Sequence, residues 1–203
     1  MRGDPSAGLR ERKKTQSRQA LQNAALRLAM EVGYERLTVE AIAEAAEVST
    51  RTFFNYFSSK DEALLAPNPD ARQRMIDAIA DRPLAEPPVA AVRAAFIEFA
   101  DELQERRDLW QARMRLVEEH PHLLPRMISS FATTEHAVAV SIAERTGRDV
   151  ATDPYPALVA AASTAALRLA LLHWDPDGPR TLAELIDELF ASLAAGLPVA
   201  GPA

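Results

Sequence analysis

The sequence lacks cysteine and has little glycine, and these two shortages exclude several kinds of site. Without cysteine the chain forms no disulfide framework and no thiolate metal site, which fits a reducing compartment. Only seven glycines occur among the 203 residues, and they build no G-x-S-x-G, P-loop or G-x-G-x-x-G motif. We therefore predict no enzyme, no cofactor and no metal.

A leader segment and long apolar runs are also missing. The first 30 residues carry charges throughout and contain no apolar core of the kind that a signal peptide needs. The longest uncharged apolar run, 157–167, is too short to span a bilayer before Arg168 interrupts it. Because 48% of the residues are hydrophobic, the chain has enough apolar side chains for a sizeable core. We predict a cytoplasmic protein with no membrane partner.

Apolar residues recur with helical spacing along most of the chain, and no segment shows a convincing strand pattern. The pattern predicts an all-α protein of about nine or ten helices. We expect a disordered tip at 1–9, a three-helix helix-turn-helix domain at 10–66, and a helical effector-binding and dimerisation bundle at 67–203. Prolines break the pattern at Pro67 and Pro69 between the two domains, and Gly33 is expected to end the first long helix.

The segment 38–57 predicts two short helices separated by a turn. Thr38 and Ser49 are good N-cap residues for these helices. In the first helix Val39, Ile42, Ala43 and Ala46 recur on one face. In the second, the expected apolar face consists of Phe53, Phe54 and Phe57.

The opposite face of the second helix suits the major groove of DNA. It carries Thr50, Arg51, Thr52, Asn55 and Tyr56. Arginine pairs with guanine, asparagine pairs with adenine, and threonine can donate, accept or meet a thymine methyl group. The alternative is a pair of amphipathic surface helices with a solvated polar face, which the periodicity alone favours equally.

The segment 37–64 resembles the DNA-binding domain of the TetR (tetracycline-repressor) family of bacterial transcription regulators. The matching residues are Thr38-Val39, Ile42-Ala43, Ala46, Val48-Ser49, the run from Thr52 to Phe57, Ser59-Lys60 and Leu64, preceded by Gly33-Tyr34 and Leu37. The resemblance covers roughly residues 15–65. It departs from the family pattern at Glu47, where a turn glycine or asparagine is usual, and at Phe54, where tyrosine is usual.

The resemblance implies a ligand-responsive regulator, a repressor, that binds a palindromic operator as a homodimer. The implied contacts to double-stranded operator DNA are Thr38, Ser49, Thr50, Arg51, Thr52, Asn55, Tyr56 and Lys60. Lys60 lies in the first turn of an expected fourth helix, where a cation is unfavourable. A phosphate contact would account for that position. The blander interpretation is a solvated surface lysine.

The charge distribution agrees with DNA binding at the amino-terminal end. Residues 1–60 hold 10 Lys or Arg and 7 Asp or Glu, a net charge of +3, although the whole chain has −6. Five of these cations lie close together, and we interpret them as an arm that contacts phosphate or a minor groove rather than as a solvated helix start. They are Arg10, Arg12, Lys13, Lys14 and Arg18.

Later segments predict two capping boxes at helix starts and a ligand cavity. Ser59 with Glu62 and Thr181 with Glu184 read as capping boxes. Bundles often hold ligands between their helices, and the resemblance implies a small hydrophobic effector, with acyl-type compounds among the candidates. The expected cavity residues are Phe96, Phe99, Trp110, Met114, Met127 and Phe131. Ordinary core packing is the alternative for these six.

The segment 157–172 is apolar almost all round, so it needs cover on a second side. With the amphipathic segment 182–197 it predicts a four-helix homodimer interface. The expected interface residues are Ala162, Ala166, Leu169, Leu185, Leu189 and Leu193.

Two alternatives are left open by the sequence. The residues Glu118, Glu119, His120 and His122 cluster around Pro121, but their spacing matches no zinc motif, and a polar helix end is the favoured interpretation. The whole chain could also be a helical small-molecule-binding or enzymatic protein whose helix-turn-helix is only structural. A gel-shift assay with the upstream DNA distinguishes that alternative from a repressor.

Overall fold

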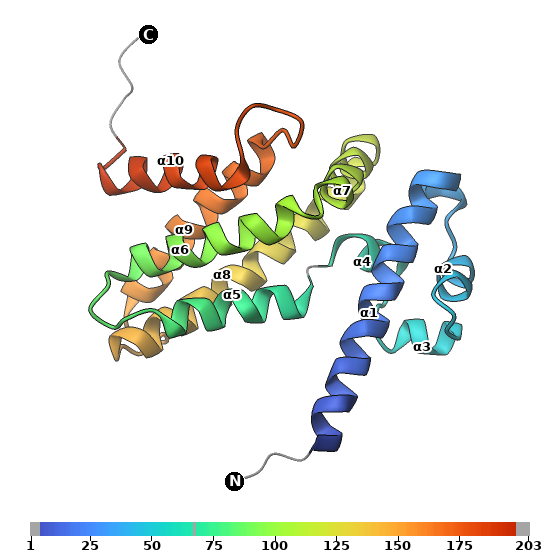
Figure 1. Ribbon diagram of the computed structural model, residues 1–203, viewed down its shortest axis with the longest axis horizontal. Coiled ribbons are helices and arrows are strands. Elements are labelled where there is room, and N and C mark those ends of the chain that lie inside the picture. The colour runs from blue at the N-terminus through green and yellow to red at the C-terminus, as the bar shows by residue number, and fades with distance from the viewer. Residues whose placement is uncertain (1–4, 67, 198–203) are drawn as a thin grey trace. The chain divides into compact units, whose positions relative to one another are not determined.

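The computed structural model describes residues 5–66 and 68–197, with side chains from residue 14 onward. Within these ranges all regular structure is helical and no strand occurs, so the predicted all-α fold is confirmed (Figure 1). Of the expected disordered tip, residues 1–4 lie outside the described ranges. The remaining residues of the tip are helical, because the first helix begins at Pro5.

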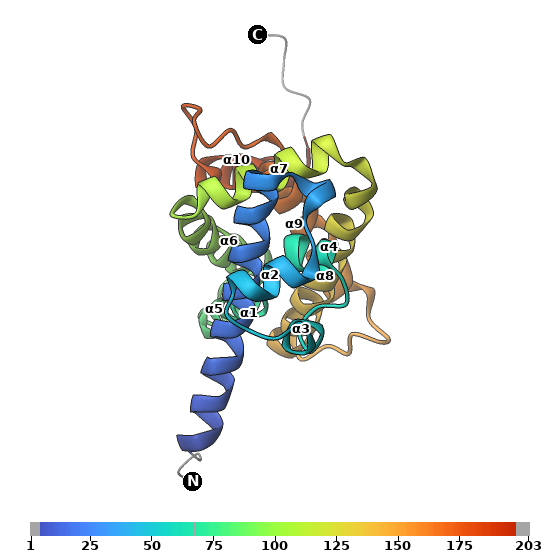
Figure 2. The ribbon, with the colours of Figure 1, turned by 90° about the vertical axis from the view of Figure 1, so that its right-hand side faces the viewer.

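The amino-terminal helices follow the predicted order, and α2 and α3 lie beside α1 in both views (Figures 1 and 2). They are α1 (Pro5–Val32), the 3₁₀ turn η1 (Tyr34–Arg36), α2 (Val39–Ala45), α3 (Thr50–Phe54) and α4 (Lys60–Leu65). Gly33 ends α1 as predicted, with φ of 85°. This positive φ is readily adopted by glycine alone.

The later helices also match the apolar stripes. They are α5 (Pro69–Asp81), α6 (Pro88–Gln104), α7 (Arg107–Glu119), the 3₁₀ turn η2 (Pro121–Leu123), α8 (Leu124–Thr146), α9 (Pro154–His173) and α10 (Leu182–Ala194). Helix α9 begins directly after Asp153, which caps it by accepting a hydrogen bond from the Tyr155 N–H at 2.8 Å. The stripe expected to run to Leu197 ends at Ala194.

The chain forms two compact units that are not continuous in sequence. The first contains the residues up to Asp70 together with Asp108–Ile128, and the second contains Ala71–Arg107 and the residues from Ser129 onward. Helix α7, η2 and the first residues of α8 therefore fold with the amino-terminal helices. The boundary predicted at residue 66 remains a prediction about the DNA-binding domain.

The core of the first unit holds the helix-turn-helix against α1. Phe53 and Phe57 are fully buried, as are Leu21 of α1 and Leu64 of α4. Helix α7 is tied to the same unit by Arg113, whose Nε donates to the carbonyl oxygen of Leu64 at 3.0 Å. These contacts hold α3 in place against α1 and α4.

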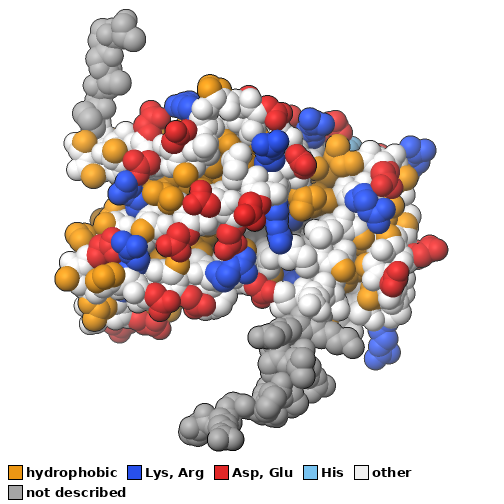
Figure 3. Space-filling model, viewed as in Figure 1, with side chains coloured by type: hydrophobic (Ala, Val, Ile, Leu, Met, Phe, Trp, Pro, Cys, Tyr) orange, Lys and Arg blue, Asp and Glu red, His pale blue; other side chains and the backbone are white. Residues whose placement is uncertain are grey.

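The core of the second unit is formed by α10 with α6 and α9. Phe96 of α6 and Phe190 of α10 are buried and meet edge to face, with ring centroids 6.1 Å apart. Acidic side chains are scattered over the outer surface of α5, α6 and α10 (Figure 3). This distribution agrees with the negative charge of the later part of the sequence.

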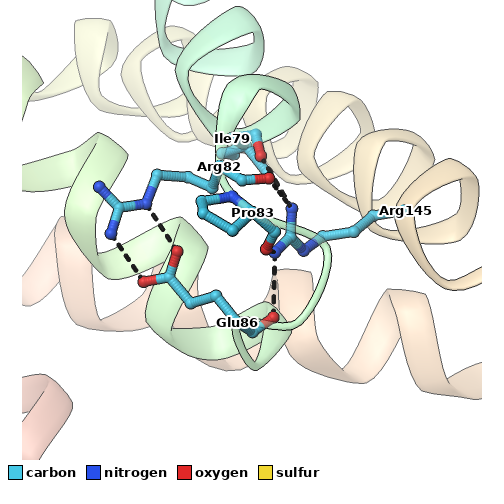
Figure 4. A network of polar contacts seen from close by, with 5 residues as sticks. All are labelled: Ile79, Arg82, Pro83, Glu86 and Arg145. Carbon is cyan, nitrogen blue, oxygen red and sulfur yellow. Dashed lines mark hydrogen bonds and ion pairs between the residues drawn. The ribbon is translucent and has the colours of Figure 1, made fainter.

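Arg145 near the end of α8 holds the end of α5 and the α5–α6 loop (Figure 4). Its guanidinium donates to the carbonyl oxygens of Arg82 at 2.9 Å and Glu86 at 3.0 Å, and also to those of Ile79 and Pro83. The side chains of Arg82 and Glu86 form a two-bond ion pair with each other. One arginine thus satisfies several carbonyls that a helix end leaves unpaired.

Helix α9 is long and apolar enough to cross a membrane by length and composition, but half of its most apolar window is buried inside the structure. Its polar residues Ser163 and Thr164 are buried too, and the Thr164 hydroxyl donates to the carbonyl oxygen of Ala160 at 2.8 Å. Burial of this kind is typical of the central helix of a bundle.

Candidate nucleic-acid interface

Both predicted caps of the helix-turn-helix are confirmed. The Thr38 hydroxyl accepts from the Ala41 N–H at 3.1 Å, and the Ser49 hydroxyl accepts from the Thr52 N–H at 3.1 Å. The Ser49 and Thr52 hydroxyls are also 2.9 Å apart and hydrogen-bonded. The start of α3 is therefore fixed by its own side chains.

The outward face of α3 carries most of the predicted contact residues. Thr50, Arg51 and Asn55 are exposed, and Thr52 and Tyr56 are half-buried. Helical spacing places Asn55 one turn from Arg51, so the two base-reading side chain types project side by side. Thr50, Arg51 and Thr52 belong to α3, Asn55 is its C-cap and Tyr56 follows in the turn, so the structure brings these five residues together at α3 and its carboxyl end.

The prediction that Phe54 belongs to the buried face of α3 is wrong. Its side chain is 58% exposed, whereas Phe53 and Phe57 are buried almost completely. Residues four apart share a helix face, so Phe53 and Phe57 fill the inner side, and Phe54 projects outward one turn after Thr50. Three consecutive or near-consecutive phenylalanines look alike in sequence, and only the packing separates them.

The turn between α2 and α3 is reached through Glu47, whose φ is 55°. The Val48 N–H donates to the carbonyl oxygen of Ala43 at 2.9 Å, which closes the end of α2. A non-glycine residue here is strained by on the order of 1 kcal/mol. The departure from the usual glycine or asparagine therefore leaves the turn geometry in place at a cost in stability.

Lys60 is tied into the first unit rather than extending freely. Its Nζ donates to the carbonyl oxygens of Tyr34 at 2.8 Å and Leu37 at 3.0 Å, and it lies 4.1 Å from the centroid of the Tyr34 ring. These carbonyls explain a cation in the first turn of α4 without a phosphate. An ammonium group has three donors, so one is still available for DNA.

Tyr34 is the centre of a polar cluster that sequence reasoning missed. Its hydroxyl donates to Asp61 at 2.8 Å and lies 2.9 Å from His122 Nε2, and its ring stacks against His120 at 4.5 Å between centroids. Burial and the hydrogen bond to Asp61 raise the pKa of Tyr34 to about 12. The two histidines thus join η2 to η1. No described residues group as three or more potential metal ligands.

Arg18, the last residue of the predicted cationic arm, contacts the segment that directly follows α3. Its Nη1 donates to the carbonyl oxygen of Tyr56 at 2.9 Å, and its guanidinium lies 4.3 Å from the centroid of the Phe57 ring. Lys14 is exposed, while the side chains of Arg10, Arg12 and Lys13 lie outside the described part. Arg18 therefore supports the end of α3.

The capping box predicted at the start of α4 forms only in part. The Ser59 hydroxyl accepts from the Glu62 N–H at 3.3 Å, as expected. The Glu62 carboxylate accepts instead from the N–H of Ser58 at 2.7 Å and from its hydroxyl at 2.6 Å. Burial alone would raise the pKa of Glu62, but these two hydrogen bonds, together with the charges of Arg18 and Arg126, hold the pKa below its usual value.

The residues predicted to line an effector cavity are divided between the two units. Phe96, Phe99 and Phe131 belong to the second, and Trp110, Met114 and Met127 belong to the first. Phe96 and Met127 are buried, and the other four side chains are half-buried. Among the described residues, the Trp110 Nε1–H has no hydrogen-bond partner. The cavity remains a prediction.

A groove of about 320 Å³ lies elsewhere, between α1 and α7 of the first unit. None of the six predicted residues lines it, and its position on two charged helix faces gave no signal in the sequence. Its lining residues are Leu26, Arg27, Met30, Asp108, Leu109, Gln111, Ala112 and Arg115.

The residues predicted for a dimer interface differ in exposure. Leu169 is 41% exposed, Ala162, Leu189 and Leu193 are half-buried, and Ala166 and Leu185 are buried within one chain. Two further apolar side chains of α9 that were not named from the sequence, Leu158 at 67% and Leu172 at 46%, are also exposed. An apolar face of α9 is therefore available on the surface of the second unit, and the interface itself remains a prediction.

Comparisons with known proteins agree with this architecture. Residues 21–66 match the family described as "Bacterial regulatory proteins, tetR family", and residues 86–198 match the "MftR C-terminal domain". The chain is 36% identical over 173 residues to the HTH-type transcriptional regulator TcmR of Streptomyces glaucescens, covering 82% of this chain and 76% of that protein. It is 28% identical over 180 residues to the putative mycofactocin biosynthesis transcriptional regulator MftR of Mycobacterium tuberculosis, covering 87% and 89%.

Solved structures show the same fold. FadR of Thermus thermophilus, a TetR-family transcriptional repressor solved with lauroyl-CoA, has a TM-score of 0.54 at 24% identity, covering 91% of this chain and 97% of that one. The fatty acid degradation regulator FadR of Bacillus halodurans also has a TM-score of 0.54, at 17% identity, covering 89% and 96%.

The helix-turn-helix on an all-helical scaffold defines a DNA-binding transcriptional regulator. The chain belongs to the TetR family of bacterial regulators, as the sequence resemblance predicted.

Proposed function

We propose that this regulator is a cytoplasmic homodimeric repressor that binds a palindromic operator and is released by a small hydrophobic effector. The exposed side of α3 carries the proposal, because it presents Thr50, Arg51 and Asn55 outward from a buried phenylalanine base. These side chain types can hydrogen-bond base edges in the major groove. In this proposal Thr52 and Tyr56 flank them, and Thr38, Ser49 and Lys60 contact the DNA backbone.

Binding to a duplex taken from the DNA upstream of the gene tests the proposal. Fluorescence anisotropy of the parent and of Arg51→Ala gives the two affinities. If Arg51 reads a base, Arg51→Ala weakens binding by about 1–3 kcal/mol and relaxes the preference at one position in each half-site. An unchanged affinity and preference would contradict the assignment of α3 as the reading helix.

Lys60 needs a test that separates DNA binding from its contacts within the protein. Lys60→Met keeps the aliphatic stem but loses both the hydrogen bonds to the carbonyl groups and any phosphate contact. If Lys60 contacts a phosphate, losing that contact reduces the magnitude of the slope of log K against log salt by about 0.9. If affinity falls while the slope stays the same, Lys60 acts only by holding η1 in position.

The effector proposal is supported by the half-buried aromatic and methionine side chains of α6, α7 and α8. One structural relative was solved with lauroyl-CoA, which makes that compound a rational first probe. Trp110 fluorescence reports binding, and operator anisotropy reports release. A coupling of about 1–3 kcal/mol lowers DNA affinity about 5- to 150-fold, and the operator weakens effector binding by the same factor.

Two variants test where the effector binds. Phe99→Trp and Met127→Trp add volume at the predicted cavity, so each should weaken the binding of a compound that uses it. Binding that is unaffected by both variants would place the effector elsewhere. A compound with equal affinity in the presence and absence of operator is not the effector.

A further inference from the structure

Phe54 combines an apolar side chain with a position on the recognition surface. Its ring is 58% exposed, although α3 buries its two other phenylalanines. In the described part of the chain, the other exposed large apolar side chains lie outside the α2–α3 segment. Phe54 is the last residue of α3, and helical spacing puts it one turn after both Thr50 and Arg51, at the carboxyl end of the exposed face of α3.

The ring is held in a defined position. Phe54 meets Phe53 edge to face, with centroids 5.5 Å apart and an interplanar angle of 86°, and Phe53 itself is fully buried. Edge-to-face pairs of this kind are favourable for aromatic rings. An exposed aromatic side chain supported by a buried one is ready to contact a partner with little further ordering.

The chemistry of the ring restricts what it can read. Phenylalanine has no hydrogen-bond donor or acceptor, so it gains nothing from a phosphate or from the polar edge of a base. The apolar group on the floor of the major groove is the C5-methyl group of thymine, which phenylalanine contacts in other complexes. A 5-methylcytosine carries the same methyl group at the same position.

We infer that Phe54 is a specificity-determining residue that contacts a pyrimidine C5-methyl group in each operator half-site. This inference rests on the proposed DNA binding through α3. Arg51 and Asn55 then select bases by hydrogen bonds, while Phe54 selects the neighbouring position by apolar contact. Burial of the ring against the methyl group removes apolar surface of both from water.

Deoxyuridine substitution tests the contact, because it removes the methyl group and leaves the base-pairing and other major-groove groups of thymine in place. The probe is the duplex that the full-length parent protein enriches from a random-sequence library, with each thymine replaced in turn. At one position per half-site, we expect deoxyuridine to weaken binding by about 4-fold, and by about 15-fold when both half-sites are substituted. Other thymines should have little effect.

Protein variants then assign the methyl contact to Phe54. Phe54→Ala should lower affinity and bring the ratio of thymine to deoxyuridine affinity at that position close to one. Phe54→Tyr keeps the ring and should keep the ratio. Leu84→Ala removes a still more exposed apolar side chain from the α5–α6 loop and should leave both affinity and ratio unchanged. Circular dichroism melting checks that each variant is folded, which the exposure of Phe54 predicts.

The outcomes separate this inference from the proposed function. If the parent enriches no sequence, both fail. If the parent binds its operator but no thymine is sensitive to deoxyuridine, or if Phe54→Ala keeps the full sensitivity, the methyl contact is wrong and DNA binding through α3 stands. If the sensitive position holds cytosine in some enriched sequences, 5-methylcytosine should restore the affinity that cytosine loses. Failure of that restoration also overturns the methyl contact.

Discussion

At the scale of single residues, Glu47 adopts a backbone conformation that is unfavourable for its residue type. Its φ of 55° is unfavourable for a residue with a Cβ atom. We expect Glu47→Gly to raise the free energy of unfolding by about 0.5–1 kcal/mol, net of the extra freedom that glycine has in the unfolded chain. Urea denaturation measures the change.

Glu40→Gly is the matched control for Glu47→Gly. Glu40 lies in the first turn of α2 with an ordinary helical conformation, so the same substitution there should destabilise by about 1 kcal/mol. Equal effects at the two positions would show that the backbone at Glu47 is not strained.

Glu62 predicts a dependence of stability on pH. Hydrogen bonds from Ser58 hold its pKa in the folded protein below the ordinary value of 4.5, although burial acts in the opposite direction. A group with a lowered folded pKa binds fewer protons when folded, so its contribution is present above about pH 4.5 and is lost as the pH falls through the folded pKa. Glu62→Gln should therefore flatten the fall in stability below pH 4.5, compared with Glu40→Gln at an exposed carboxylate. Urea midpoints between pH 3 and 7 measure it, and equal profiles for the two variants would contradict the role of Ser58.

The caps of the helix-turn-helix could be predicted from the sequence, whereas the hydrogen-bond partners of Lys60 could not. Thr38 and Ser49 bond backbone groups three residues away, so the signal is contained in the local sequence. The carbonyl groups that bind Lys60 lie 26 and 23 residues away, at the first residue of η1 and at its C-cap. Their position depends on how η1 packs on α4, which no local pattern encodes. Phe54 was predicted on the buried face of α3 because the local pattern does not show which phenylalanines pack inward.

At the scale of the elements, Arg145 is the residue on which the α5–α6 connection depends. Its removal leaves several carbonyl groups without a donor at the end of α5 and in the loop (Figure 4). We expect Arg145→Met to lower the free energy of unfolding by about 2–4 kcal/mol, because these are hydrogen bonds to a charged group in a partly buried site. Hydrogen exchange should show faster opening of the α5–α6 loop.

Arg148→Met provides the comparison for Arg145→Met. Arg148 pairs with Asp153 at the surface and should cost less than about 1 kcal/mol when replaced. If both variants lose the same stability, the bonds to the carbonyl groups contribute no more than an exposed ion pair.

Helix ends show which element-level signals are reliable. The capping box at Thr181 and Glu184 forms in full, since the Glu184 carboxylate accepts from the Thr181 N–H at 2.8 Å. At α4 the neighbouring Ser58 offers an N–H and a hydroxyl, and Glu62 takes both. A motif of four residues predicts the start of a helix well, but the choice among adjacent donors depends on the conformation of the preceding turn.

At the scale of the whole molecule, the exposed face of α9 predicts association. Leu169 lies on the mostly apolar helix α9, and its side chain is 41% exposed. Leu169→Glu therefore changes the surface without opening the core of one chain. We expect this variant to be a monomer by light scattering at micromolar concentration and to bind operator at least tenfold more weakly, because a palindrome needs both recognition helices. Leu84→Glu, at a side chain 76% exposed in another place, should remain a dimer. A monomeric parent would contradict the prediction.

The sequence predicted the helices and their order, but not how they are grouped. Helical periodicity is local, and it predicted both the all-α chain and the amphipathic segment 182–197, which contains α10. The packing of α7 with the amino-terminal helices depends on Arg113 reaching Leu64 and on His122 reaching Tyr34, which are 49 and 88 residues apart. Contacts over such separations follow from the tertiary structure and leave no periodic pattern.

This grouping has a consequence for the exchange of modules between regulators. The chain passes between the two compact units three times, at 70/71, 107/108 and 128/129. A chimera joined at the Pro67–Pro69 break would separate the helices α1 to α4 from Arg113 and His122, which come from α7 and η2. The helices α1 to α4 transplanted alone would expose the surface of α4 and Tyr34 that these residues cover. Such a chimera would need a matched α7–η2 segment from the donor, so that new specificities are more readily obtained by changing α3 in place than by recombining domains.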